Sequence, residues 1–244
     1  MRSTALRRRP RLSPLWVALA FAVALMGSLW APRRVVAQTT PPTMSATAAG
    51  QRVVSTLDAV STSLRSTRYT HATSIDPHAG RYDWDCSVMA AWVLRRSAPE
   101  AARVLPGRRP LAVDFYRTIR SAPTVGRRGP WTRVARLSEA RAGDVLAWPR
   151  PRWFPSRNTG HVAFVAEPPR VVSGGVLVRI VDATSVPHEA DSRVYGGLGG
   201  FGTGTLRVDT DPATGEGIAY GWIGSATPQN YMVETPVVIG RVWR

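Results

Sequence analysis

From residue 129 onward the sequence consists of short apolar runs, rich in Val, Ile and Trp, that are separated by Gly and Pro. Such runs, bounded by turn residues, are typical of β-strands. Strands are expected over residues 143–148, 161–167, 176–184, 204–208, 217–224 and 236–243. The stretch TDPATGEG, between the fourth and fifth runs, is typical of a hairpin turn. This part of the chain is therefore expected to form an antiparallel sheet.

The part of the chain before residue 129 follows a helical period instead. Apolar residues recur there at spacings of four, three and four, and these residues are Val53, Leu57, Val60 and Leu64. Further helices are expected over residues 87–96, in the segment that ends at 105, and from 110 onward. Residues 69–80 carry turn residues without a clear period, so we expect a loop. Helices followed by an antiparallel sheet indicate an α+β domain.

The first 37 residues are arranged like a secretory signal peptide. Arginines precede an uncharged run over residues 15–31, and Val35 and Ala37 are the small residues that a signal peptidase requires. The run is shorter than the ~20 residues of a comfortable membrane span, which favours cleavage before Gln38 over a retained anchor. We expect a secreted or periplasmic protein without stable membrane insertion, with a flexible leader over 38–50 and one domain over 51–244.

The chain is strongly basic, with a formal charge of +16 that comes entirely from arginine. Residues 1–37 hold seven arginines and no acid, so their removal leaves +9. A basic surface favours anionic partners such as cell-wall polymers, lipid headgroups or nucleic acid. The absence of lysine is also explained by a GC-rich genome, in which case most arginines only solvate the surface. The arginines are scattered and no nucleic-acid-binding motif accompanies them, so we expect no nucleic acid partner.

Cys86 is the only cysteine, and this excludes an internal disulfide framework. The ~207 residues that follow the leader are enough to bury a core without one. Cys86 directly precedes an apolar helix, and a helix N-terminus stabilises a thiolate and offers N–H groups to an oxyanion. The residue is therefore either a nucleophile or a small buried apolar side chain.

A nucleophilic thiol needs a base and a third group that orients the base. Of the four histidines, His161 opens a strand after the stretch PSRNTG, so its ring is expected at a sheet edge within reach of a neighbouring helix. Alternation along residues 176–184 places Asp182 on the same face as three apolar residues. Asp182 could orient the imidazole. It could also start a turn, and His161 could be a water-exposed histidine at a strand end.

Three motifs resemble those of the NlpC-like cell-wall cysteine peptidases. DCSVMAAWVL resembles their Asp-Cys-Ser-(Gly)-(apolar) helix start, AGDVLAW is similar to their Pro-Gly-Asp strand, and TGHVAFV is similar to their His-Val strand. The motifs follow the family order over about residues 66–190. The resemblance implies a papain-like α+β fold in which N-terminal helices pack on an antiparallel β-sheet. It implies a nucleophile at Cys86, a base at His161 and an orienting residue at Asp182, with no cofactor and no metal.

The resemblance also implies which residues contact substrate. Either Tyr69 or Tyr82 would match the upstream tyrosine that lines such sites, and Asp85 and Ser87 flank the nucleophile. The expected function is that of a secreted, monomeric cysteine hydrolase that cleaves an amide bond, with peptidoglycan stem peptides as substrate. The alternative is a non-catalytic binding module that keeps the fold and holds an anionic cell-wall polymer.

This sequence departs from the family pattern at several positions. Val88 stands where the family has glycine, and Asp182 stands where many members have a second histidine. The segment after Asp182 continues into His188, Asp191 and Arg193, which suggests a branch with its own substrate.

Two further patterns are not expected to form a metal site or a phosphate-binding loop. His71, Asp76, His78 and Cys86 could bind a metal ion, but their spacing does not match a zinc pattern. The glycine run over residues 196–204 is expected to be a flexible connection, because no strand-to-helix context makes it a phosphate loop.

Overall fold

Four α-helices form in the first part of the described chain. The structure is a computed structural model that describes residues 45–193 and 197–244, so the expected signal peptide and residues 38–44 of the expected leader lie outside the described residues. The helices are α1 (Ala48–Ser63), α2 (Cys86–Ser97), α3 (Pro99–Arg103) and α4 (Ala112–Ser121). Helix α1 thus begins within the segment that was expected to be flexible, because Thr47 caps it by accepting a hydrogen bond from the N–H of Gly50 at 2.8 Å.

Eleven strands lie in the described residues, and the longer ones coincide with the expected runs. The first three are short: β1 (Ser66–Tyr69), β2 (Ser74–Asp76) and β3 (Arg81–Trp84). The others are β4 (Trp131–Val134), β5 (Val145–Pro149), β6 (Gly160–Val165), β7 (Arg170–Val172), β8 (Gly175–Thr184), β9 (Gly200–Thr210), β10 (Gly217–Gly221) and β11 (Val233–Val242). Residues 69–80, expected as a loop, contain β2 and the end of β1, which form a small sheet with β3.

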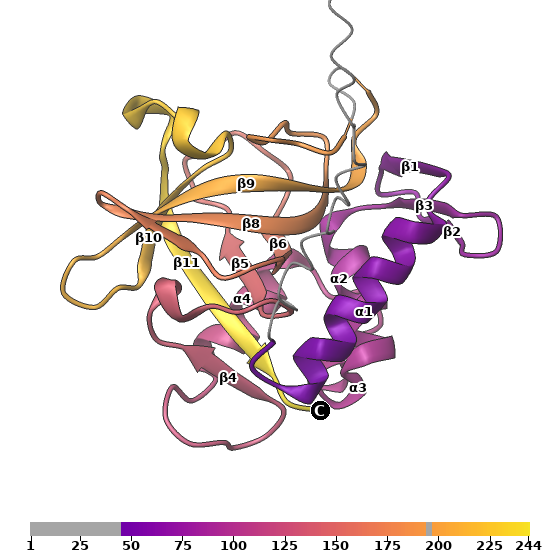
Figure 1. The fold of residues 1–244 in the computed structure, drawn as a ribbon, viewed down its shortest axis with the longest axis horizontal. Coiled ribbons are helices and arrows are strands. Elements are labelled where there is room, and N and C mark those ends of the chain that lie inside the picture. The colour runs from indigo at the N-terminus through magenta and orange to yellow at the C-terminus, as the bar shows by residue number, and fades with distance from the viewer. Residues whose placement is uncertain (1–44, 194–196) are drawn as a thin grey trace, which may run out of the picture. The chain divides into compact units, whose positions relative to one another are not determined.

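The expectation of a papain-like α+β fold, with N-terminal helices packed on an antiparallel sheet, is wrong. Strand β10 pairs with β9 on one side and with β11 on the other. The order β10-β9-β8-β6-β5-β11 therefore returns to β10 and closes a six-stranded antiparallel β-barrel. Figure 1 shows the long strands β8, β9 and β11 wrapping around this barrel. Closure removes both edges that an open sheet would expose.

Closure depends on the length of β11, which serves different neighbours along its course. Its first half pairs with β10, and its second half pairs with β4 through Ile239 to Val242. Strand β5 lies along the opposite edge of β11. A register shift in β10 between Gly217 and Ala219 accompanies the turn of the sheet onto itself. The sequence pattern identifies each strand, but it does not contain this pairing of remote segments.

Two hydrophobic cores follow from the alternation of side chains along the barrel strands. Leu146, Trp148, Ala163 and Ile180 belong to the core inside the barrel. The residues between them point outward and join a second core with the helices; these are Val145, Ala147, Val162, Phe164 and Val181. Strands β5, β6 and β8 are thus buried on both faces, which is why they read as nearly continuous apolar runs.

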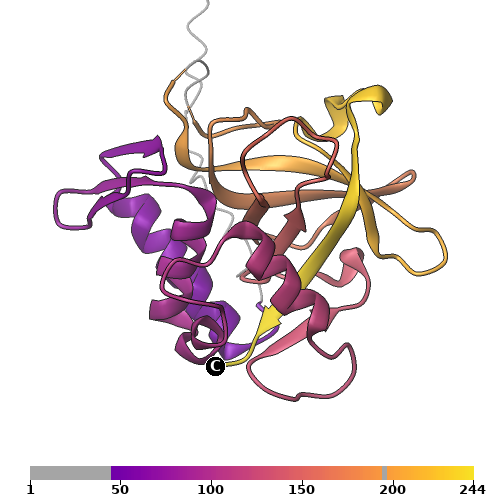
Figure 2. The same cartoon turned by 180° about the vertical axis from the view of Figure 1, so that it is seen from behind.

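The helices cover one part of the barrel wall. Helix α2 contacts β6 and β8, and α4 contacts β5, β6 and β11. Figure 1 shows α1, α2 and α3 together beside the barrel, and Figure 2 shows α4 across its strands from behind. Within the described residues, no helix has both the length and the apolar character needed to cross a bilayer.

The glycine of the AGDVLAW motif has a packing role. Gly143 has φ +84°, and an added Cβ would lie 2.3 Å from the carbonyl oxygen of Gly50 in α1. Asp144 follows it, is buried, and accepts hydrogen bonds from Arg241 Nη2 at 2.8 Å and from the N–H of Arg141 at 2.8 Å. The motif therefore joins α1, β5 and β11.

We predict that Gly143→Ala destabilises the fold by about 3 kcal/mol, because a left-handed backbone and a backbone clash act together. Gly107→Ala is the matched control, since Gly107 has φ +66° with nothing within 4 Å of an added Cβ. We expect the control to lose only about 1 kcal/mol. Urea unfolding of both variants measures the difference, and equal losses would contradict the assigned contact.

Candidate active site

Cys86 is the first residue of α2, at the junction between the helices and the barrel. Asp85 caps the helix, because its Oδ1 accepts a hydrogen bond from the N–H of Val88 at 2.9 Å. The first N–H groups of a helix have no intrahelical partner, so they remain able to bind an anion beside the sulfur. Cys86 is free and buried, with 4% of its surface exposed.

His161 and Asp182 lie on neighbouring barrel strands and share the inward-facing side. Strands β6 and β8 are antiparallel, and Phe164 pairs with Val181. This register places Ala163 opposite Asp182, with His161 two residues further along the same face. His161 Nε2 donates a hydrogen bond to Asp182 Oδ2 at 2.8 Å, and both side chains are buried. The bond uses Nε2, so Nδ1 is the ring nitrogen left for another partner.

The side chains of His161 and Cys86 interact. Burial alone would lower the pKa of His161, but a negative charge on Cys86 and hydrogen bonds with Asp182 and Cys86 outweigh it and raise the pKa to about 10. The arrangement therefore favours the protonated imidazolium form of His161. The structure brings the nucleophile, the base and the orienting carboxylate expected from the sequence into one cluster.

Asp182 stays ionised although no part of it is exposed. Burial would raise the pKa of its carboxyl group, but hydrogen bonds from His161 and His188 outweigh burial and hold the pKa far below its usual range. Arg193 Nη1 donates to Asp182 Oδ1 at 2.7 Å. A buried carboxylate with three donors is a fixed negative charge behind the His161 ring.

Two pockets meet at this cluster. A pocket of about 250 Å³ reaches Cys86, with His71, Asp85, Leu111 and Arg157 in its wall. A narrower pocket of about 80 Å³ reaches His161. The two pockets share Tyr69, Asn158 and Gly160 in their walls, so they adjoin along these residues.

The structure separates the two tyrosines that the sequence left as alternatives. Tyr69 lines both pockets. Burial, followed by the charges of Cys86 and Asp85, raises the pKa of Tyr69 far above its usual value, so its hydroxyl remains a donor. Tyr82 lies in the core with 2% of its surface exposed, and its hydroxyl is 2.8 Å from Ser63 Oγ. Tyr69 is therefore the tyrosine that a bound substrate can reach.

The residues that flank Cys86 have different surroundings. Asp85 and Ser87 line the larger pocket, and Asp85 Oδ2 is 3.1 Å from Nδ1 of the exposed His71. Val88 packs against the core between helices and barrel. The side chain at the family's glycine position thus lies among apolar residues of the core.

An aromatic wall beside His161 was not expected from the sequence. Trp148 lies opposite His161 in the β5–β6 register, with ring centroids 5.0 Å apart. Trp222 contacts His161 edge-on at 5.2 Å, and Tyr220 lies beside both tryptophans. Alternation along its strand indicates that Trp148 points into the barrel, so its position could have been predicted from the sequence. Trp222 comes from the segment after β10, where no such pattern indicates its position.

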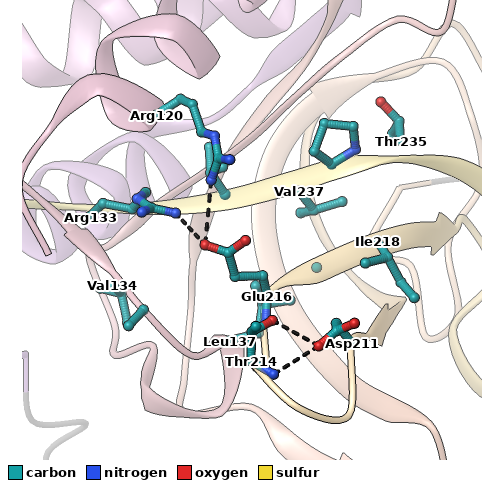
Figure 3. Close-up of a pocket in the computed structure, with 14 residues that line it drawn as sticks. Arg120, Arg133, Val134, Leu137, Asp211, Thr214, Glu216, Ile218, Thr235 and Val237 are labelled. Atoms are coloured by element: carbon teal, nitrogen blue, oxygen red, sulfur yellow. Dashed lines mark hydrogen bonds and ion pairs between the residues drawn. The ribbon is translucent and has the colours of Figure 1, made fainter.

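A larger cavity, of about 450 Å³, lies elsewhere, next to α4, β4 and the β9–β10 hairpin. Its lining includes the apolar side chains of Val134 and Val237, and Figure 3 shows Arg120 and Arg133 both contacting the Glu216 carboxylate. The cavity has no thiol and no histidine in its lining. The cluster around Cys86 is therefore the candidate for catalysis.

The metal site considered from the sequence is not present in the described part of the chain. No group of three or more His, Cys, Asp or Glu residues there is arranged to hold a metal ion. His71 and Cys86 are near the same pocket, but His71 is paired with Asp85.

We predict that Cys86→Ser lowers the pKa of His161 from about 10 by at least one unit. The imidazolium is stabilised by a negative charge on Cys86, and serine carries no charge at neutral pH. Titration of the histidine ring signals by NMR measures the change. The exposed His78 lines neither pocket and serves as the internal control. An unchanged His161 titration would show that sulfur and imidazole are not coupled.

No family model, curated protein or solved structure matches this chain. The resemblance of the three motifs to NlpC-like peptidases therefore stays a prediction.

Proposed function

We propose that this protein is an exported cysteine hydrolase that cleaves an amide bond. The observation that carries the proposal is the position of Cys86 at a helix N-terminus, coupled to a buried His161–Asp182 pair. A nucleophile, a base and an orienting carboxylate at such positions are the parts that thiol acyl transfer needs. The pockets on both sides of the pair give a substrate access to it.

The reaction follows from the charges of the cluster. The Cys86 thiolate attacks the amide carbonyl carbon and forms a C–S bond, and the negative charge moves to the carbonyl oxygen. The N–H groups at the start of α2 can donate to that oxygen. His161 gives its proton to the departing amine as the C–N bond breaks, which leaves a thioester on Cys86. Water, deprotonated by His161, then attacks the thioester, releases the acid and returns the thiol.

The proposed substrate is a stem peptide of cell-wall peptidoglycan. The similarity of DCSVMAAWVL, AGDVLAW and TGHVAFV to motifs of cell-wall peptidases supports this choice, and so does the expected signal peptide. The larger pocket can hold an amino-acid side chain, and the narrower one accepts only a small group. This asymmetry favours a small residue on the His161 side of the scissile bond.

We predict that Cys86→Ala lowers the hydrolysis of purified peptidoglycan by about 1,000-fold or more without loss of fold. His161→Ala should have a comparable effect, and His78→Ala should have none, because His78 is exposed and lines neither site pocket. Release of new amino groups, with mass spectrometry of the fragments, measures the reaction. Unchanged hydrolysis by folded Cys86→Ala would refute the proposal.

A second function, binding of an anionic cell-wall polymer, is favoured by the loop that joins β5 and β6. We call residues 150–159 the arginine loop, since it holds Arg150, Arg152 and Arg157 and no acid. Within the described residues, none of the three forms an ion pair. Trp153 in the same loop is 65% exposed. Guanidinium groups that have no ion-pair partner and lie near an exposed indole are suited to binding a phosphate-bearing polymer.

We predict that Arg152→Gln/Arg157→Gln weakens binding to poly(glycerol phosphate) by about 10-fold at low salt and reduces its salt dependence. Arg103→Gln/Arg170→Gln removes the same charge from exposed positions outside this loop and is the matched control. Trp153 fluorescence and co-sedimentation report binding, which should persist in Cys86→Ala. Equal weakening in both double variants would show that only net charge matters.

A further inference from the structure

Asp182 holds a second imidazole that the proposed reaction does not use. His188 Nε2 donates to Asp182 Oδ2 at 3.1 Å, the same oxygen that accepts from His161 at 2.8 Å. Arg193 occupies the other oxygen, Oδ1. The side chain of His188 is fully buried, and its Nδ1 has no hydrogen-bond partner in the described residues. A second proton on this ring would therefore have no acceptor.

The barrel interior is shaped to admit these two side chains. Gly202 and Gly204 lie on β9 with the same parity as the inward-facing Leu206. An added Cβ at Gly204 would be 2.4 Å from His188 Cβ, and one at Gly202 would be 2.7 Å from Arg193 Cγ. Residues 200–204, expected as part of a flexible connection, thus form a strand whose glycines leave room for the groups that bind Asp182.

Hydrogen bonds within the segment that carries His188, and to a neighbouring turn, hold this segment in place. Asp191 Oδ2 accepts from the N–H of His188 at 3.0 Å, and Asp191 Oδ1 accepts from Arg193 Nε at 2.9 Å. Glu189 Oε1 accepts from Ser225 Oγ at 2.8 Å, which ties the segment to the turn after Trp222. We call residues 188–193 the buttress, because two of their side chains, those of His188 and Arg193, contact Asp182.

Trp222 links the two imidazoles. The His188 ring stacks on it with an interplanar angle of 3° and a centroid distance of 5.4 Å, while His161 meets it edge-on at 5.2 Å. His188 can neither rotate nor leave without disturbing this stack. Its hydrogen bond consequently fixes the orientation of the carboxylate that His161 uses.

We infer that His188 is a positioning residue for the proposed hydrolase: it holds Asp182 in place and moderates its charge, so that the His161 imidazolium can release its proton to the leaving amine. The inference rests on the proposed function. His188 lines neither site pocket, so it acts through Asp182 and does not touch substrate.

The charge effect has a defined sign. The ionisable groups facing Asp182 are His161 from β6, His188 and Arg193 from the buttress, Tyr69 from β1 and, through His161, Cys86 from α2. Each donor withdraws charge from the carboxylate. Loss of the His188 donor leaves more negative charge facing His161, stabilises the imidazolium and raises the pKa of His161. An imidazolium that holds its proton more tightly is a weaker general acid.

The test compares His188→Phe with His188→Gln in the full chain. Phenylalanine keeps an aromatic ring on Trp222 and removes the donor, whereas glutamine keeps an N–H donor for Asp182. We expect His188→Phe to raise the pKa of His161 by about half a unit and to lower kcat about 3-fold with unchanged KM. His188→Gln should bring both the pKa of His161 and kcat most of the way back to the native values. NMR titration and peptidoglycan hydrolysis are the two measurements.

The outcomes separate this inference from the proposed function. A folded His188→Phe variant with an unchanged His161 titration and unchanged kcat would overturn the inference while hydrolysis by the native protein stands. Absence of hydrolysis by the native protein, with the His161 shift present, would overturn the function and leave only the coupling. If His188→Phe does not fold, the ¹⁵N spectrum of native His188 decides: a proton on Nε2 supports the inference, and a proton on Nδ1 alone refutes it.

Discussion

A carboxylate buried inside an apolar barrel is the constraint on which the arrangement of the site depends. Without partners, the Asp182 charge would be very unfavourable there, and the group would be protonated. His161, His188 and Arg193 instead satisfy it from three directions. Removal of any one donor leaves a buried charge short of a partner, which costs more than the hydrogen bond contributes when it is present. The position of the candidate site is thus set by the place in the barrel where the charge of Asp182 can be compensated.

The barrel supplies the rigidity that this compensation requires. Strands β6 and β8 are buried on both faces, so the two backbones that carry His161 and Asp182 have little freedom to move apart. Helix α2 packs on the outside of the same two strands and brings Cys86 to their ends. A thiol from one layer and an imidazole from the other meet where the layers join, and Trp148 and Trp222 contact the imidazole.

Local features of the sequence were predictable, and pairings between remote segments were not. The six expected strands are present because each is a short run with apolar residues between turn residues, and alternation placed Asp182 on the same face as Val178 and Ile180. Barrel closure was missed because β10 and β11 recognise each other through register, which leaves no mark in either run. The β1–β3 sheet was missed because its strands are too short to show a period. His188 could not be assigned a role, since its partner is fixed by the glycines of β9.

The dependence of the barrel on β11 has a consequence for the order in which the protein folds. Within the ring β11 pairs with β10 and with β5, so the ring cannot close until residues 233–240 have joined β5, whose paired residues lie up to 95 positions earlier (Gly240 with Val145). Contacts of such sequence separation form slowly, because a large loop must be closed before they contribute. Cys86, His161 and Asp182 all lie on segments that precede β11, so the ring that holds their strands together stays open until β11 arrives.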